Sequence, residues 1–234
     1  MKITTLSPIK YNTNSYNINE KQKTKNHTSH QIMPLFKKEQ NISFGAKKIS
    51  IKAIKTLIES LRKENIDFEL LATDKYATVV EFKDSKTLAK STSFFKDGIK
   101  KIINYRPDGT TPHTALQYQN ETLQKIITYD INGCKKTKHT FYPSGQRESI
   151  TTYTGFVNFP KSKKIYYKNG KTIKSEIKYH TNCKLPETIK EFNNKGILFR
   201  KSTFDNEGRI ISKISYDKKG NAIAHSDFSY NVPV

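Results

Sequence analysis

The side chains that could act as nucleophiles, bases or metal ligands are few in this sequence. His27 and His30 lie in a polar N-terminal stretch, and the remaining histidines, at positions 113, 139, 180 and 225, are dispersed. The sequence contains no serine elbow, no HExxH pair and no glycine-rich phosphate loop. We therefore expect a protein that is not an enzyme and binds no cofactor. A hydrolase-like or toxin-like site would require residues distant in the sequence to converge.

One set of residues has the chemistry of a zinc site. Cys134 with His139, and His180 with Cys183, combine ligand types at short spacings. In the repeat described below, however, the two pairs fall near turns four strands apart, about 19 Å at about 4.8 Å per strand. Zinc holds its ligands at about 2 Å, so we expect no metal site unless the sheet closes on itself. These two cysteines are the only ones, which argues against a disulfide framework.

The strongest chemical signal is positive charge. The chain has a net charge of +21, and residues 125–184 carry thirteen Lys and Arg against three Asp and Glu, a net +10. Tyrosines lie between the lysines, a combination suited to phosphate backbones or anionic lipid. The candidate anion-binding residues are Lys135, Lys136, Lys138, Arg147, Lys161, Lys163, Lys164, Lys168, Lys171 and Lys174. The alternative is a solvated face whose lysines prevent sheets from pairing edge to edge.

A repeat of about twelve residues must position these side chains. Aromatic residues recur from Phe82 to Phe228 in steps of 11 to 13 residues, and eight of the ten glycines lie four residues after one of them. In the segment Phe204–Ile210, Gly208 suits the last position of a three-residue hairpin loop, where φ is positive. Asp205 would then pair with Arg209, and Phe204 with Ile210. Each unit thus predicts one strand and one turn.

This arithmetic also predicts which side chains share a face. A step of twelve residues is even, so the in-register aromatics should lie on one face, in two rows along the two edges of the sheet. The candidate partner-binding residues on this aromatic face are Tyr129, Phe141, Tyr153, Tyr166, Tyr179, Phe204 and Tyr216. The thirteen-residue steps between Tyr153 and Phe192 would exchange the faces unless a bulge or a longer turn absorbs the extra residue.

Several units resemble known β-hairpin repeats. Phe141–Gln146 and Tyr166–Lys171 resemble the bacterial variant of the MORN repeat, and Tyr129–Gly133 and Tyr216–Gly220 resemble the YD repeats of RHS-type proteins. The resemblance covers residues 80–230. It implies stacked hairpins and a binding or scaffolding role, and it transfers no site residues. The second glycine pair of a full MORN unit is absent.

Two segments precede the repeats. Residues 1–47 are polar, basic and aperiodic, and we expect them to be disordered. Residues 48–65 predict an amphipathic helix, because Ile51, Ile54, Ile58 and Leu61 fall on one stripe. Its basic opposite side suits either a membrane surface or, as we expect, a helix packed on the following sheet. Asn65 marks the end of the pattern.

The predicted fold is all-β, with residues 66–234 forming an elongated antiparallel meander of about twelve strands. No apolar run is long enough to cross a membrane and no secretory signal is visible, so the default expectation is a cytoplasmic protein. Non-classical secretion stays an alternative. The predicted function is protein binding through the aromatic face, with self-association as a further option. The alternative is binding of nucleic acid or an acidic membrane through residues 125–184.

Overall fold

The computed structural model describes residues 51–73, 75–155, 158–181 and 184–228. The predicted N-terminal tail lies outside these ranges. One helix, α1 (Ile51–Lys63), precedes the strands. The strands are β1 (Phe68–Ala72), β2 (Tyr76–Asp84), β3 (Thr87–Phe95), β4 (Ile99–Tyr105), β5 (Pro112–Gln119), β6 (Thr122–Tyr129), β7 (Lys135–Phe141), β8 (Arg147–Tyr153), β9 (Pro160–Tyr166), β10 (Ile173–Tyr179), β11 (Pro186–Phe192), β12 (Leu198–Phe204), β13 (Ile210–Tyr216) and β14 (Ala222–Asp227).

The predicted helix is confirmed, and it ends before Asn65, where the apolar pattern ends. Asn65 has a φ of +55°, the left-handed conformation that stops a helix. The backbone N–H of Asn65 donates to the Arg62 carbonyl, and that of Ile66 donates to the Leu61 carbonyl, which together form a Schellman motif. Ile66 then packs against the core that contains Leu61. The chain is thereby turned toward β1.

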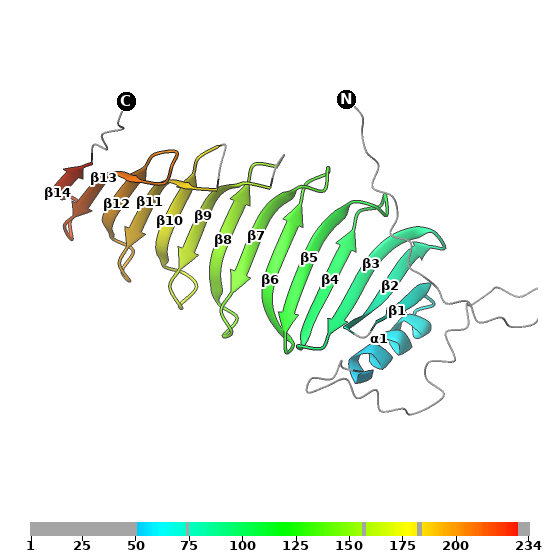
Figure 1. Ribbon diagram of the computed structural model, residues 1–234. Coiled ribbons are helices and arrows are strands. Elements are labelled where there is room, and N and C mark those ends of the chain that lie inside the picture. The colour runs from blue at the N-terminus through cyan, green and yellow to red at the C-terminus, as the bar shows by residue number, and fades with distance from the viewer. Residues whose placement is uncertain (1–50, 74, 156–157, 182–183, 229–234) are drawn as a thin grey trace, which may run out of the picture. The chain divides into compact units, whose positions relative to one another are not determined.

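All described strands form one antiparallel sheet in chain order, which confirms the predicted meander (Figure 1). The sheet is open, with β1 and β14 at its ends, and it has fourteen strands rather than about twelve. One of the additional strands is β1, which precedes the first aligned aromatic residue, Phe82, and was therefore not counted among the repeats.

The turns explain the varying step length. Gly208 has a φ of +83°, its N–H donates to the Asp205 carbonyl, and the Asp205 N–H donates to the Arg209 carbonyl, as the repeat predicted. The thirteen-residue steps have longer turns instead: the Tyr167 N–H reaches the Thr172 carbonyl, and the His180 N–H reaches the Leu185 carbonyl. The longer turn absorbs the additional residue, so the strand register continues unchanged.

The prediction of one aromatic face is wrong. Phe204 pairs with Ile210, but the next pair is Thr203 with Ser212, so one residue bulges from β13 directly after the turn. A bulge of one residue exchanges the faces. Similar shifts follow most turns, so consecutive aromatics alternate between the two faces as well as between the two edges.

The helix packs on the sheet, as expected. Ile54, Ile58 and Leu61 of α1 form a buried cluster with Ala77, Val79 and Phe94 of β2 and β3. We call the side of the sheet that contains Val79 the helix face. The cluster involves only the first strands, and β14 is exposed along its whole length. No helix in the described ranges is long and apolar enough to cross a membrane.

Candidate binding face

The register places one continuous row of side chains across the face opposite α1. Residues that pair directly in antiparallel strands point to the same side, so the row can be followed from partner to partner. It reads Val80, Ser91, Ile103, Ala115, Ile127, Lys138, Thr151, Lys163, Ile177, Ile189, Ser202 and Lys213. We call this side of the sheet the lysine face.

Four ammonium groups gather in the middle of the lysine face. Lys125, Lys135 and Lys163 surround Lys138, and burial together with these three charges lowers the pKa of Lys138. Lys135 lies over the ring of Tyr153, with its Nζ 5.8 Å from the ring centroid. Strands β6 to β9 therefore concentrate positive charge at the cost of mutual repulsion.

No acidic residue offsets this charge on the lysine face of β4 to β10, all of whose residues are described. The register assigns Lys101, Lys125, Lys135, Lys138 and Lys163 to it, and strand alternation adds Lys136 and Lys161. The helix face differs, because Lys164 there lies 3.2 Å from Glu176. The two faces thus have different electrostatic character, which the total charge of the segment does not reveal.

Small residues form the floor of the lysine cluster. Thr151 pairs with both Lys138 and Lys163, and its neighbour Ser149 on β8 accepts or donates a 2.7 Å hydrogen bond to Thr140. Thr151 and Ser149 are buried, with 5% and 3% exposure, although no second layer covers them in the described ranges. The longer side chains of β7 and β9 therefore cover them.

Three of the predicted partner-binding residues, Tyr129, Tyr153 and Tyr179, lie along one edge of the lysine face, as does Phe204. Burial raises the pKa of all three tyrosines, and Tyr105 contributes to the shift of Tyr129. Phe141, Tyr166 and Tyr216 lie on the helix face. Tyr166 is only 8% exposed, so it belongs to the packing of the sheet.

The predicted anion-binding residues separate in the same way. Lys135, Lys136, Lys138, Lys161 and Lys163 lie on the lysine face, whereas Lys164 and Lys174 lie on the helix face. Arg147 stacks over the Tyr166 ring at 5.6 Å, and Lys168 and Lys171 are exposed in the turn after β9. Sequence reasoning omitted Lys101 and Lys125 from the candidate list, because only the strand register shows that they share a face with Lys138.

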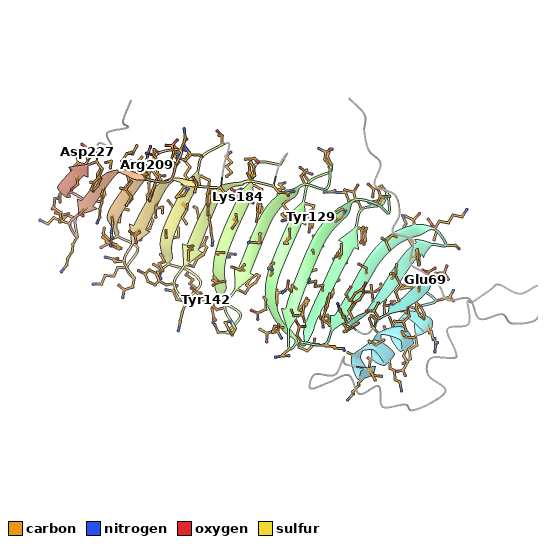
Figure 2. The ribbon with its side chains drawn as sticks, in the orientation of Figure 1. Glu69, Tyr129, Tyr142, Lys184, Arg209 and Asp227 are labelled. Atoms are coloured by element: carbon orange, nitrogen blue, oxygen red, sulfur yellow. The ribbon has the colours of Figure 1, made fainter. Side chains whose placement is uncertain are left out.

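The turns contact one another along each edge. The Tyr142 hydroxyl donates to the Tyr166 carbonyl, and the Tyr167 hydroxyl donates to the Phe192 carbonyl, both at 2.7 Å. On the opposite edge, Arg106 donates to the Tyr129 carbonyl and His180 Nε2 lies 3.0 Å from the Asp205 carbonyl. Figure 2 shows Tyr142 at one edge and Lys184 and Arg209 at the other. These bonds fix the spacing of alternate strands, and thereby the spacing of the lysines.

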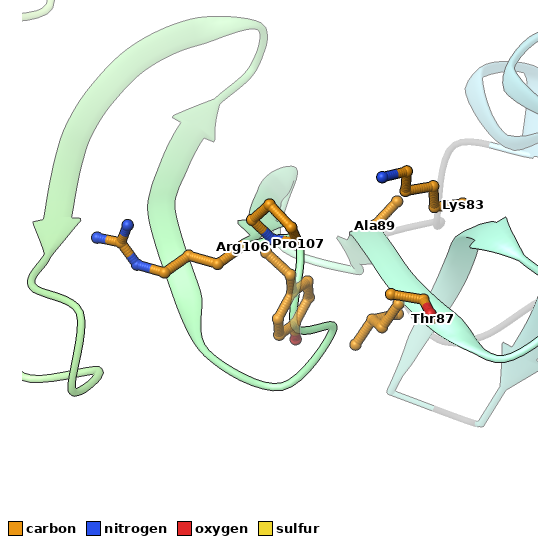
Figure 3. Close-up of a pocket in the computed structure, with 7 residues that line it drawn as sticks. Lys83, Thr87, Ala89, Arg106 and Pro107 are labelled. Carbon is orange, nitrogen blue, oxygen red and sulfur yellow. The ribbon is translucent and has the colours of Figure 1, made fainter.

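The cavities give no evidence of a small-molecule site. One cavity of about 190 Å³ lies between the turns after β2 and β4 and is lined by Lys83, Thr87 and Tyr105 (Figure 3). It is smaller than the several hundred Å³ of typical ligand pockets. The Arg106 guanidinium points away from it, toward the carbonyl of Tyr129. Within the described ranges no three His, Cys, Asp or Glu residues group as metal ligands. Cys183 of the zinc combination lies outside these ranges.

Comparisons with known proteins assign this chain to no family. No protein-family model matches the sequence, and no curated protein matches it.

Among solved structures, a mutant of S. aureus TarM in complex with Fondaparinux, alpha-GlcNAc-glycerol and UDP is 11% identical, with a TM-score of 0.37 over 57% of this chain and 25% of that one. A second TarM structure is 12% identical, with the same TM-score over 58% and 25%. Accessory secretory proteins 1, 2 and 3 of Streptococcus pneumoniae give 13% identity and a TM-score of 0.20 over 48% and 18%. This chain spans a quarter or less of these structures, and TM-scores this low support no inference about its activity.

Proposed function

We propose that this protein is a non-enzymatic binding protein, and that the lysine face of β6 to β9 holds an anionic macromolecule. The observation that supports this proposal is the charge distribution: the lysine face of β4 to β10 carries lysines on four of its strands and no acidic residue. A lysine cluster whose members repel one another costs stability, which is typical of functional surfaces.

The hairpin repeat supplies the rigid platform that such a surface needs. Hydrogen-bonded turns hold alternate strands at about 10 Å, and the lysines stand on strands rather than on loops. The resemblance to MORN and YD repeats points to the same class of function. Catalysis would require a constellation of acid, base and nucleophile. The strands β6 to β9 place the hydroxyl groups of Thr140, Ser149 and Thr151 beside the ammonium and phenol groups, and they place no carboxylate or imidazole on the lysine face.

Two variants with equal loss of charge test the proposal. One replaces Lys125, Lys138 and Lys163 of the lysine face by Gln, and the other replaces Lys164, Lys174 and Lys190 of the helix face. Binding of three probes is measured against salt: poly-glutamate of 20 residues, a 20-nucleotide oligothymidylate and phosphatidylserine vesicles.

We expect at least one probe to bind with an affinity that falls steeply with salt. The lysine-face variant should bind it at least about tenfold more weakly, since each lysine near an anionic surface contributes about 1 kcal/mol. The helix-face variant should bind it within about twofold of the parent protein. Equal losses in the two variants, or no salt-dependent binding of any probe, would contradict the proposal.

A further inference from the structure

The lysine cluster is bordered by apolar side chains in its own row. On one side of Lys138, Thr151 and Lys163 lies Ile127 of β6, and on the other side lie Ile177 of β10 and Ile189 of β11. None of the three isoleucines is buried within the sheet. A partner that lies along this row would therefore contact an apolar side chain first, then the lysines, and then apolar side chains again.

This composition discriminates between classes of anionic partner. A phosphate backbone is bound by charge and by planar, bidentate donors, for which arginine is the preferred residue. The lysine face of β4 to β10 contains no arginine, and isoleucines beside the lysines would gain nothing from contact with phosphate. Apolar side chains next to lysines instead complement a protein surface that carries acidic and apolar residues together.

The spacing of the row suits a helix that crosses the strands. Lys138 and Lys163 are two strands apart, about 10 Å, which is close to the about 10.5 Å rise of seven helical residues. Ile127 and Ile177 are four strands apart, about 19 Å, or about thirteen helical residues. The opposite face already accommodates an amphipathic helix, since α1 packs its apolar stripe on β2 and β3.

Resting on the proposed function, we infer that the partner is an amphipathic helix of another protein, which carries two acidic residues one heptad apart between apolar ends. The segment lies along the row, with its carboxylates at Lys138 and Lys163 and its apolar ends on Ile127 and Ile177. This chain's own α1 does not fit the description, because its exposed side carries Lys52, Lys55, Arg62 and Lys63.

The test uses a designed helical peptide of 18 residues with Glu at two positions one heptad apart, and with Leu at two flanking positions about two heptads apart on the same side of the helix. A control peptide has Ser in place of each Leu, and the 20-nucleotide oligothymidylate represents nucleic acid. The protein is compared with an Ile127→Ser/Ile177→Ser variant. An Ile126→Ser/Ile150→Ser variant removes two isoleucines from the helix face instead and serves as the matched control.

We expect the Ile127→Ser/Ile177→Ser variant to bind the Leu peptide about tenfold more weakly, a change of about 1.4 kcal/mol. Its binding of the control peptide and of oligothymidylate should stay within about twofold, because only charge holds these probes. The matched variant should bind like the parent protein, and thermal melts verify that each variant is folded.

Equal binding of the Leu peptide by parent and Ile127→Ser/Ile177→Ser variant would overturn the inference, as would tighter binding of oligothymidylate than of the peptide at physiological salt. Both outcomes leave the proposed function standing if binding still depends on Lys125, Lys138 and Lys163. Loss of that dependence would overturn the proposed function itself.

Discussion

At Lys138, the positive charge that we propose for binding opposes the stability of the fold. Burial and the charges of Lys125, Lys163 and Lys135 lower its pKa in the folded state. The folded protein then binds fewer protons than the unfolded chain between the lowered and the ordinary pKa, so stability rises with pH across that interval. At neutral pH the charged Lys138 is a net cost to folding.

Replacing Lys138 by Met keeps the aliphatic stem and removes the charge. We expect Lys138→Met to stabilise the protein at pH 7 by about 0.5 kcal/mol, within the usual range for cross-strand pairs. Urea denaturation measures the change, with Lys174→Met on the exposed helix face as the control. A loss of stability on Lys138→Met, or an equal gain in both variants, would show that the cluster carries no repulsion.

The turn aspartates determine the response to acid. The Thr111 hydroxyl and the backbone N–H groups of Thr111 and Thr110 donate hydrogen bonds to Asp108, and these bonds lower its pKa to about 2. A depressed pKa stabilises the folded state above the ordinary value of 3.8 and loses that contribution as the pH falls toward 2. Asp205 and Asp217 have lowered pKa values as well, with hydrogen bonds opposing the effect of burial.

Asparagine can replace these aspartates without loss of the turn, since other turns already contain it. Asn169 accepts the bonds that correspond to those of Asp108, from Lys171 and Thr172, and Asn193 accepts the bonds that correspond to those of Asp205 and Asp217, from Lys195 and Ile197. We expect the Asp108→Asn/Asp205→Asn/Asp217→Asn variant to lose less stability than the parent protein when the pH is lowered from 5 to 2. Chemical denaturation at several pH values measures this. Parallel pH profiles of the two proteins would contradict the assignment.

At the scale of elements, the turns divide into two kinds of glycine position. Gly145 has a φ of +83° and open space around its α-carbon, whereas Gly170 has a φ of +68° and lies against the preceding turn on the same edge. A Cβ at position 170 would approach the Cβ of Gln146 to 2.9 Å and the backbone nitrogen of Arg147 to 3.0 Å. The longer turn after β9 thus needs glycine for two reasons.

We expect Gly145→Ala to cost about 1 kcal/mol of stability, because only the backbone conformation resists it. Gly170→Ala should cost about 1 to 3 kcal/mol more, because the neighbouring turn must also move. The midpoints of urea denaturation compare the two variants directly. Equal costs would mean that adjacent turns do not support each other.

These elements also show how much of the fold can be predicted from the sequence alone. Helix α1 follows from its apolar stripe, and the turn at Gly208 follows from the positive φ that a short hairpin loop requires. The sequence left open whether a bulge or a longer turn absorbs the thirteen-residue steps. The assignment of side chains to the two faces of the sheet does not follow from such rules. It depends on the bulge at Ile210 and Ile211, which does not change the spacing of the aromatic residues and glycines. The lysine cluster can be identified only from the strand register, because Lys163 and Lys164 are neighbours in the sequence but lie on opposite faces.

For the described sheet as a whole, stability is expected to be uneven. Each strand contacts only its neighbours, as in other repeat proteins, and the buried apolar cluster lies at one end, under α1. The strand β14 has six exposed residues, and no other described strand pairs with its outer edge. We expect amide hydrogen exchange to be slowest in β2 and β3 and fastest in β14, read peptide by peptide by mass spectrometry. Uniform protection along the sheet would show that it unfolds as one cooperative unit.

The central claim is that one face of the sheet binds an anionic partner. Lysine acetylation footprinting tests it most directly, with the full chain labelled in the presence and absence of a saturating concentration of whichever of the three probes binds most tightly, and the modified sites quantified by mass spectrometry. We predict that Lys125, Lys138 and Lys163 become protected while Lys164, Lys174 and Lys190 react as before. Equal protection of both sets, or protection of the helix-face set alone, would contradict the account.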